Sequence, residues 1–293
     1  MQMYEEVEII APPSVKARIY RNQQDIKTTD GQIITDDVHI MPPPEFFPRS
    51  DWIIAEQNEI AGLLALDVME LVHISEVPKH EKIASTRFVH TVKSGKDNEP
   101  ILKARFVVRG YDTVHEVHFY ETHAPTPDIN VVRLAIIIAA SKGWKIFSAD
   151  VTKAFIHASL DTTVYVSYPG DKVNVWRLKK ALYGLKNAPL EWQNHLTDIL
   201  SKFGFVLCKL GTSIYRKFSE TEVDPENPGL KKLLAILIVY VDDLLFFCEE
   251  EDFWNEFIEG LQEFLPLTDT GLVKTWCGLE IIHHAKYEYR ISQ

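Results

Sequence analysis

The sequence has 293 residues, of which 46% are hydrophobic, and its 42 acidic and 31 basic side chains give a formal net charge of −11. This hydrophobic content is sufficient for the core of one large domain or two modest ones. The net charge is unusual for a nucleic-acid-binding protein, which normally presents a basic surface. The three cysteines are scattered and lack CxxC spacing, which argues against a disulfide framework or a zinc site and fits a reducing compartment.

No targeting or membrane segment is evident. The first residues, Met1 to Glu8, are acidic rather than basic and apolar, so we expect no signal peptide. The longest apolar run, residues 233–241, is about half the length of a membrane span. We therefore expect no membrane association and a cytoplasmic or nuclear location.

The first third of the chain contains a tail, a helix and two strands. Residues 1–48 have no hydrophobic period and contain two proline clusters, which predicts a poorly structured tail or linker. Apolar residues at helical spacing predict a helix from Trp52 to Val72. Strands are predicted over residues 87–92 and 102–108.

The middle of the chain contains a second helix, residues 131–142. Asn130 is its predicted N-cap and Gly143 its predicted end. Apolar residues occupy every face of its central turns, so we expect the helix to be well buried. A strand over residues 144–149 then ends at Asp150, and further strands are predicted over residues 163–166 and 173–179.

Two more helices are predicted in the last third. One begins near Pro189 and ends near Gly204, because proline is favoured in the first helical turn and glycine just past the last. The other is amphipathic and runs from Glu250 to Phe264. Two short strands are predicted within residues 205–218. Since strands and helices are mixed rather than strictly alternating, we predict an α+β fold with an antiparallel sheet.

Two adjacent carboxylates, Asp242 and Asp243, interrupt an apolar run that extends from residue 233 to residue 247. An unpaired buried carboxylate either becomes protonated or finds a cation. A hairpin of two buried strands would resolve this by presenting both side chains at the rim of a sheet, in a form suited to a hard cation such as Mg²⁺. The alternative from these residues alone is an ordinary hairpin with an acidic tip.

Three ordered motifs connect this hairpin to a known family. They are the stretches from Asp150 to Phe155, from Ala181 to Pro189 and from Tyr240 to Asp243. Their order and spacing resemble the reverse transcriptase of copia-type LTR retrotransposons. Flanking stretches extend the similarity from about Trp52 to Gln293: residues 103–110, 121–125 and 277–281.

The resemblance implies the fingers and palm of a right-hand polymerase, with an antiparallel palm sheet, over residues 49–293. We expect this domain to be truncated before the thumb and to lack an RNase H domain, because the sequence stops at Gln293. It also implies an RNA-directed DNA polymerase, a nucleotidyltransferase that extends a primer 3′-hydroxyl with dNTPs. The expected partners are therefore an RNA or DNA template with its primer, and the chain would be part of a longer polyprotein. The oligomeric state is left open.

The same resemblance assigns the metal site. Asp150 and Asp242 would each bind both of two Mg²⁺ ions, with Mn²⁺ as a possible substitute, and Asp243 would complete the acidic cluster. Such ions stand about 3.5–4 Å apart in two-metal sites. Three carboxylates this close repel one another unless cations are bound, so the empty site should be strained.

The resemblance also implies substrate contacts. Phe155 would exclude a ribose 2′-hydroxyl, with core packing as the alternative. Tyr183 and Gly184 would lie beneath the templating base and the incoming nucleotide, Gly184 allowing a close backbone approach. Lys103 and Arg105, which share one face of the second predicted strand, would contact the triphosphate, and their relative roles are open.

Lys186 would contact the template backbone or, alternatively, be a solvated loop lysine.

Several motif positions depart from the family pattern, among them Asn187, Leu190 and Cys277. None of these departures removes an expected metal ligand. These departures leave open an alternative function, in which the chain is a catalytically idle remnant or a domain that binds RNA or protein.

Overall fold

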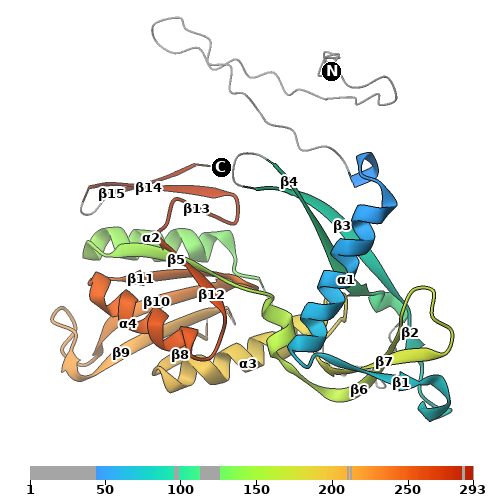
Figure 1. The fold of residues 1–293 in the computed structure, drawn as a ribbon. Helices are drawn as coiled ribbons and strands as arrows, with labels where there is room; N and C mark the ends of the chain where they lie inside the picture. Colours follow the sequence, from blue (N-terminus) through green and yellow to red (C-terminus); the bar gives the residue numbers. More distant parts are fainter. Residues whose placement is uncertain are drawn as a thin grey trace, which may run out of the picture. The chain divides into compact units, whose positions relative to one another are not determined.

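The computed structural model describes residues 44–95, 99–112, 126–209, 211, 213–285 and 288–292 (Figure 1). Most of the predicted tail, and the stretch 121–125, lie outside these residues. The chain divides into two compact units, which we describe separately. The first comprises residues 1–60 and 88–105, and the second residues 61–87 and 106–293.

The first unit combines most of helix α1 (Arg49–Ala65) with most of the two-stranded sheet of β3 (Thr86–Ser94) and β4 (Pro100–Val108). Glu56 of α1 accepts hydrogen bonds from both guanidinium nitrogens of Arg49, at 2.6 and 2.9 Å, and lies 2.8 Å from His90 Nε2 of β3. Burial alone would raise the pKa of Glu56, but the hydrogen bonds from Arg49 and His90 outweigh it and lower the pKa. Trp52 stacks on the His90 ring, at 4.3 Å between centroids. A paired carboxylate and an aromatic stack thus fix α1 to the sheet of this unit.

The second unit is built around a six-stranded sheet in the order β12-β5-β11-β10-β9-β8, in which every pair is antiparallel. A four-stranded sheet (β1-β7-β6-β2) and a three-stranded sheet (β13-β14-β15) complete its strands. The strand bounds are β1 Met69–His73, β2 Ile83–Ala84, β5 Lys145–Val151, β6 Ser159–Ser167, β7 Asn174–Lys180, β8 Phe205–Leu207, β9 Ile214–Val223, β10 Lys231–Tyr240, β11 Asp243–Cys248, β12 Leu267–Leu272, β13 Thr275–Trp276, β14 Leu279–Ala285 and β15 Glu288–Ser292.

The helices of this unit are α2 (Ile129–Lys142), α3 (Ala188–Lys202) and α4 (Glu251–Gln262), with short 3₁₀ turns at η2 (Ile74–Glu76), η4 (Gly110–Asp112) and η5 (Ala154–His157). A further turn, η1 (Pro44–Phe46), precedes α1 in the first unit. The predicted α+β architecture with an antiparallel sheet is therefore present in the described residues.

Helices cover both faces of the six-stranded sheet (Figure 1). Successive side chains of a strand point to opposite faces, and this alternation divides the core. Ile146 of β5 and Leu245 of β11 belong to the cluster that contains the buried side chains of α2. Phe246, next along β11, stacks instead on Phe257 of α4, at 4.7 Å between ring centroids. The central strands β5 and β11 are thereby buried on both sides, which anchors the residues at their ends.

The predicted helix over residues 52–72 is wrong in its second half. Helix α1 ends at Ala65, and the residues from Met69 to His73 form strand β1. Asp67 adopts a left-handed conformation, with φ 51°. Its N–H donates to the Leu64 carbonyl, and the Val68 N–H donates to the Leu63 carbonyl. This is a Schellman ending, which glycine usually provides and aspartate provides here.

Three further predictions about helices need correction. The N-cap of α2 is Asp128 rather than Asn130, because the Asp128 carboxylate accepts the Asn130 N–H at 2.7 Å. One face of α2 is exposed, since Leu134 and Ile137 are 48% and 63% accessible, so the helix is not buried all round. The amphipathic helix predicted to run to Phe264 ends at Gln262, and Phe264 itself is 44% exposed. The predicted end of α2 at Gly143 is confirmed, with φ 65°.

Two glycines let separate backbone segments touch in the second unit. The Val108 N–H donates to the Tyr183 carbonyl at 2.8 Å. Gly184 has φ +90°, and a Cβ at this position would overlap the Val108 carbonyl oxygen. A Cβ on Gly110 would in turn overlap the Gly184 carbonyl oxygen. Gly184 therefore allows a close approach between segments of the chain itself, whereas its predicted approach to template and nucleotide stays a prediction.

Gly184→Ala should destabilise the second unit far more than Gly170→Ala. Gly170 has nearly the same φ, +89°, but nothing lies within 4 Å of a Cβ there. Gly170→Ala should therefore cost only the left-handed conformation, about 1 kcal/mol. Gly184→Ala should cost a further 2 kcal/mol or so, because a backbone carbonyl cannot rotate away as a side chain can. Urea unfolding followed by tryptophan fluorescence would measure both, and equal losses would contradict this account.

Candidate active site

The end of the β10–β11 hairpin forms the centre of the candidate site. Tyr240 pairs with Asp243, so the turn between the strands consists of Val241 and Asp242 alone. The prediction of a hairpin between two buried strands is confirmed, although Asp243 is the first residue of β11 rather than part of the turn. Val241 has φ 57°, a left-handed conformation that is a genuine outlier for a β-branched residue.

Strand β5 brings the third carboxylate to this turn. Asp150 is the register partner of Asp243 across the β11–β5 pair. Directly opposed residues of antiparallel strands have Cα atoms about 4.5–5.5 Å apart. The Val151 N–H also donates to the Asp242 carbonyl at 2.8 Å, which ties the turn to β5. Asp150, Asp242 and Asp243 are thus brought together from two sequence segments, as the motifs predicted.

The electrostatics of the site follow from burial and from the crowding of these carboxylates. Burial, followed by the charges of Asp242 and Asp150, raises the pKa of Asp243. The Sγ of Cys277, in the turn between β13 and β14, lies 3.6 Å from Asp243 Oδ2. Burial and the Asp243 carboxylate raise the pKa of Cys277 to about 12. A neutral thiol at this position can donate to the carboxylate, an interaction that the sequence did not predict.

The donor chemistry of the site fits a hard divalent cation, because its groups are carboxylate oxygens, which Mg²⁺ and Mn²⁺ prefer. Within the described ranges, no three His, Cys, Asp or Glu side chains form a ready-made metal-binding group. Mutual repulsion among Asp150, Asp242 and Asp243 opposes their closing into such a group. The assignment of these residues as metal ligands remains a prediction.

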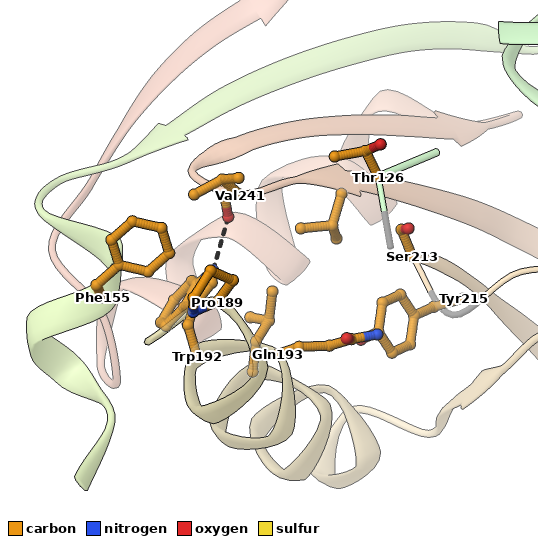
Figure 2. A pocket seen from close by; sticks show the side chains of 10 residues that line it. Thr126, Phe155, Pro189, Trp192, Gln193, Ser213, Tyr215 and Val241 are labelled. Carbon is orange, nitrogen blue, oxygen red and sulfur yellow. Dashed lines mark hydrogen bonds between the residues drawn. The ribbon is translucent and has the colours of Figure 1, made fainter. Parts of the chain in front are cut away.

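Phe155 lies close to the hairpin turn, on η5, which directly follows β5. Its ring is half-buried and meets the Tyr183 ring edge to face, at 5.4 Å between centroids. Both Phe155 and Val241 line a small cavity of about 50 Å³ between the hairpin and α3 (Figure 2). Phe155 is therefore not a fully buried core residue, and its predicted steric role stays a prediction.

The other predicted substrate residues are distributed over both units. Gly184 and Lys186 are exposed in the loop between β7 and α3, and Tyr183 beside them is half-buried. Lys103 and Arg105 lie on β4 in the first unit, where both are half-buried and flank the buried Ala104. Their shared face on an extended strand is confirmed. Their contacts with template or nucleotide remain predictions.

Sequence reasoning missed one residue that touches the turn. Trp192 Nε1 donates a hydrogen bond of 2.7 Å to the Val241 carbonyl (Figure 2). Trp192 lies in α3, within the helix predicted to begin near Pro189, and is 2% exposed. No sequence signal could link its indole to residue 241, because the two are 49 positions apart.

In the portion of the chain described here, no helix is long and apolar enough to cross a membrane.

Comparisons with known proteins agree with the motifs. A family model described as "Reverse transcriptase (RNA-dependent DNA polymerase)" matches residues 68–293. The chain is 29% identical over 236 residues to the retrovirus-related Pol polyprotein from transposon RE1 of Arabidopsis thaliana, covering 78% of this chain and 15% of the relative. It is 25% identical over 278 residues to the corresponding polyprotein from transposon TNT 1-94 of Nicotiana tabacum, covering 92% of this chain and 20% of the relative.

Among solved structures, a foamy viral protease-reverse transcriptase in complex with double-stranded DNA matches with 14% identity and a TM-score of 0.41, over 78% of this chain and 33% of that one. The chain spans only 15% and 20% of the two polyproteins it resembles. The family match nevertheless covers well over half of the chain. The chain therefore belongs to the reverse transcriptase (RNA-dependent DNA polymerase) family in the form carried by retrotransposon Pol polyproteins, as the copia-type resemblance of its motifs predicted.

Proposed function

We propose that this chain catalyses RNA-templated and DNA-templated DNA synthesis, adding nucleotides from dNTPs to a primer 3′-hydroxyl. The observation that carries the proposal is the pairing of Asp150 with Asp243 across β5 and β11, directly beside Asp242. In a member of this family, three carboxylates at the ends of buried strands are best explained as ligands of Mg²⁺ or Mn²⁺. Two such cations would supply an activated 3′-hydroxyl and neutralise the charge of the triphosphate.

The contribution of the chain is to hold these carboxylates at fixed positions. Phosphoryl transfer depends mainly on positioning and electrostatic stabilisation rather than on covalent chemistry by the protein. Strands β5 and β11 are buried on both faces, so the ends that carry Asp150 and Asp243 have little freedom to move. The hydrogen bond from Val151 to the Asp242 carbonyl fixes the turn to the same strand.

We assign the two units to the parts of a right-hand polymerase. The second unit, with its six-stranded antiparallel sheet, would be the palm, and the first unit, with β3 and β4, would belong to the fingers. Lys103 and Arg105 would then bind the triphosphate, the first as a compact point charge and the second as a planar fork. Lys186 would contact the template backbone, and the natural context would be a longer polyprotein.

The first test removes one proposed ligand. Asp242→Asn should lower the single-turnover rate of primer extension by at least about 100-fold, because it removes charge from the site where transition-state charge is stabilised. Circular dichroism should show an unchanged fold, since Asp242 is a partly exposed turn residue.

Asp252→Asn is the matched control, because this aspartate is exposed in the first turn of α4 and should leave the rate unchanged. Undiminished extension by Asp242→Asn would rule out the metal site. If the folded wild-type chain fails to extend a primer on a homopolymer template with Mg²⁺ or Mn²⁺, the alternative of an idle remnant or binding domain is correct instead.

The second test concerns sugar selection. Phe155→Val should raise the efficiency of ribonucleotide incorporation relative to deoxyribonucleotide incorporation, by about tenfold or more, because a smaller side chain leaves room for a 2′-hydroxyl. The measurement is the ratio of kcat/KM for dNTP and rNTP with the same base.

The control for sugar selection is Phe253→Val. It trims a half-buried aromatic residue of α4 that does not line the cavity beside the hairpin. An unchanged ratio in Phe155→Val would assign Phe155 to packing.

A further inference from the structure

The turn that carries Asp242 is strained. Val241 has φ 57°, and a left-handed conformation costs an ordinary L-residue roughly 1–2 kcal/mol, with β-branched residues among the least suited to it. Such a conformation persists only where the surroundings enforce it. The question is which contacts hold Val241 in place.

Packing of the Val241 side chain only partly holds this residue in its left-handed conformation. Its side chain is half-buried and lines the cavity of about 50 Å³ that lies between the hairpin and α3 (Figure 2). An unfilled space on one side removes the close atomic contacts that would otherwise hold a side chain. The conformation of Val241 therefore depends in part on its backbone groups.

The carbonyl of Val241 is fixed by Trp192. The indole Nε1–H donates to it at 2.7 Å, and the tryptophan is 2% exposed, so water cannot readily replace either partner. This carbonyl belongs to the peptide group that joins Val241 to Asp242. Any rotation that relaxes φ of Val241 moves that peptide, and therefore displaces the backbone of Asp242.

The buried tryptophans of the described residues differ in their hydrogen bonding, and in the first unit Trp52 Nε1 donates to the Pro44 carbonyl at 3.1 Å. Three other buried indole groups, those of Trp176, Trp254 and Trp276, have no hydrogen-bond partner among the described residues. The indole of Trp192 is instead directed at the one strained residue of the hairpin turn. That contrast favours a specific role over packing alone.

We propose that Trp192 is a positioning residue: its indole N–H clamps the carbonyl of strained Val241 and so keeps Asp242 and Asp243 in the arrangement that binds metal. The catalytic consequence rests on the proposed function, whereas the clamp itself does not. Trp192 acts through the turn, because its indole donates to a main-chain carbonyl and not to a carboxylate of the site.

The test compares Trp192→Phe with Trp254→Phe. Both substitutions remove an indole N–H and the same volume from a buried site, but only the first breaks a hydrogen bond. A tenfold change in an equilibrium corresponds to about 1.4 kcal/mol, which lies at the upper end of the range for one hydrogen bond.

Hydrogen exchange reports on the clamp without any activity. In the wild-type chain the Trp192 indole N–H should exchange slowly, as seen by NMR. In Trp192→Phe the amide of Val151, which donates to the Asp242 carbonyl, should exchange about tenfold faster, while amides in the middle of β10 and β11 keep their rates. Trp254→Phe should leave the Val151 rate within about twofold.

Metal binding and primer extension should distinguish the two variants in the same way as hydrogen exchange does. Trp192→Phe should weaken Mn²⁺ binding, measured by electron paramagnetic resonance, and lower the extension kcat, each by about tenfold, with the KM for dNTP nearly unchanged. Trp254→Phe should lower thermal stability without this effect. Equal losses in both variants, or rapid exchange of the wild-type Trp192 indole, would overturn the proposal.

A second variant tests the link to strain. Asparagine tolerates the left-handed conformation, so Val241→Asn should reduce the need for a clamp. In that background Trp192→Phe should accelerate Val151 exchange by less than about threefold. An undiminished tenfold effect would show that the indole acts on something other than the strained turn. If even the wild-type chain extends no primer, the proposed function fails, while the exchange measurements still decide whether the clamp exists.

Discussion

The pairing of β5 with β11 is the constraint on which the candidate site depends. Two carboxylates, Asp150 and Asp243, are register partners at the end of strands that are mostly apolar and buried on both sides. The strands cannot slip, because a shift of one residue would move each side chain to the opposite face of the sheet. Their hydrophobic burial therefore enforces the proximity of like charges. Burial and, after it, the charges of Asp242 and Asp150 raise the pKa of Asp243, and a bound cation would offset this cost of ionisation.

The elements of the fold that could be predicted from sequence are those specified by local pattern. The apolar run ending at Val239 predicts a buried strand, and Gly143 ends α2 because glycine accepts the left-handed conformation. The end of α1 was missed because Asp67 replaces the expected glycine, so the hydrophobic period ran on through Met69 into β1. The exposed face of α2 was missed for a different reason, since an all-apolar helix does not reveal which side its neighbours cover.

The residues of the candidate site also separate into those that the sequence predicts and those that it does not. Asp150, Asp242 and Asp243 could be predicted because ordered motifs mark them, and the structure brings them together. The contacts of Cys277 with Asp243 and of Trp192 with Val241 could not, because each joins residues far apart in sequence through a geometry that only the packed strands create. A motif identifies the groups that perform chemistry. It contains no information about the neutral groups that hold them in place.

That the supporting groups are neutral has a physical rationale. A lysine or arginine beside Asp242 would stabilise the crowded carboxylates, but it would also compete with a divalent cation for the same oxygens. The indole of Trp192 and the backbone N–H of Val151 instead act on main-chain carbonyls of the turn. They restrict the backbone without neutralising the side-chain charge. These two groups therefore leave the repulsion among the carboxylate side chains unchanged, while they hold the backbone of the turn in place.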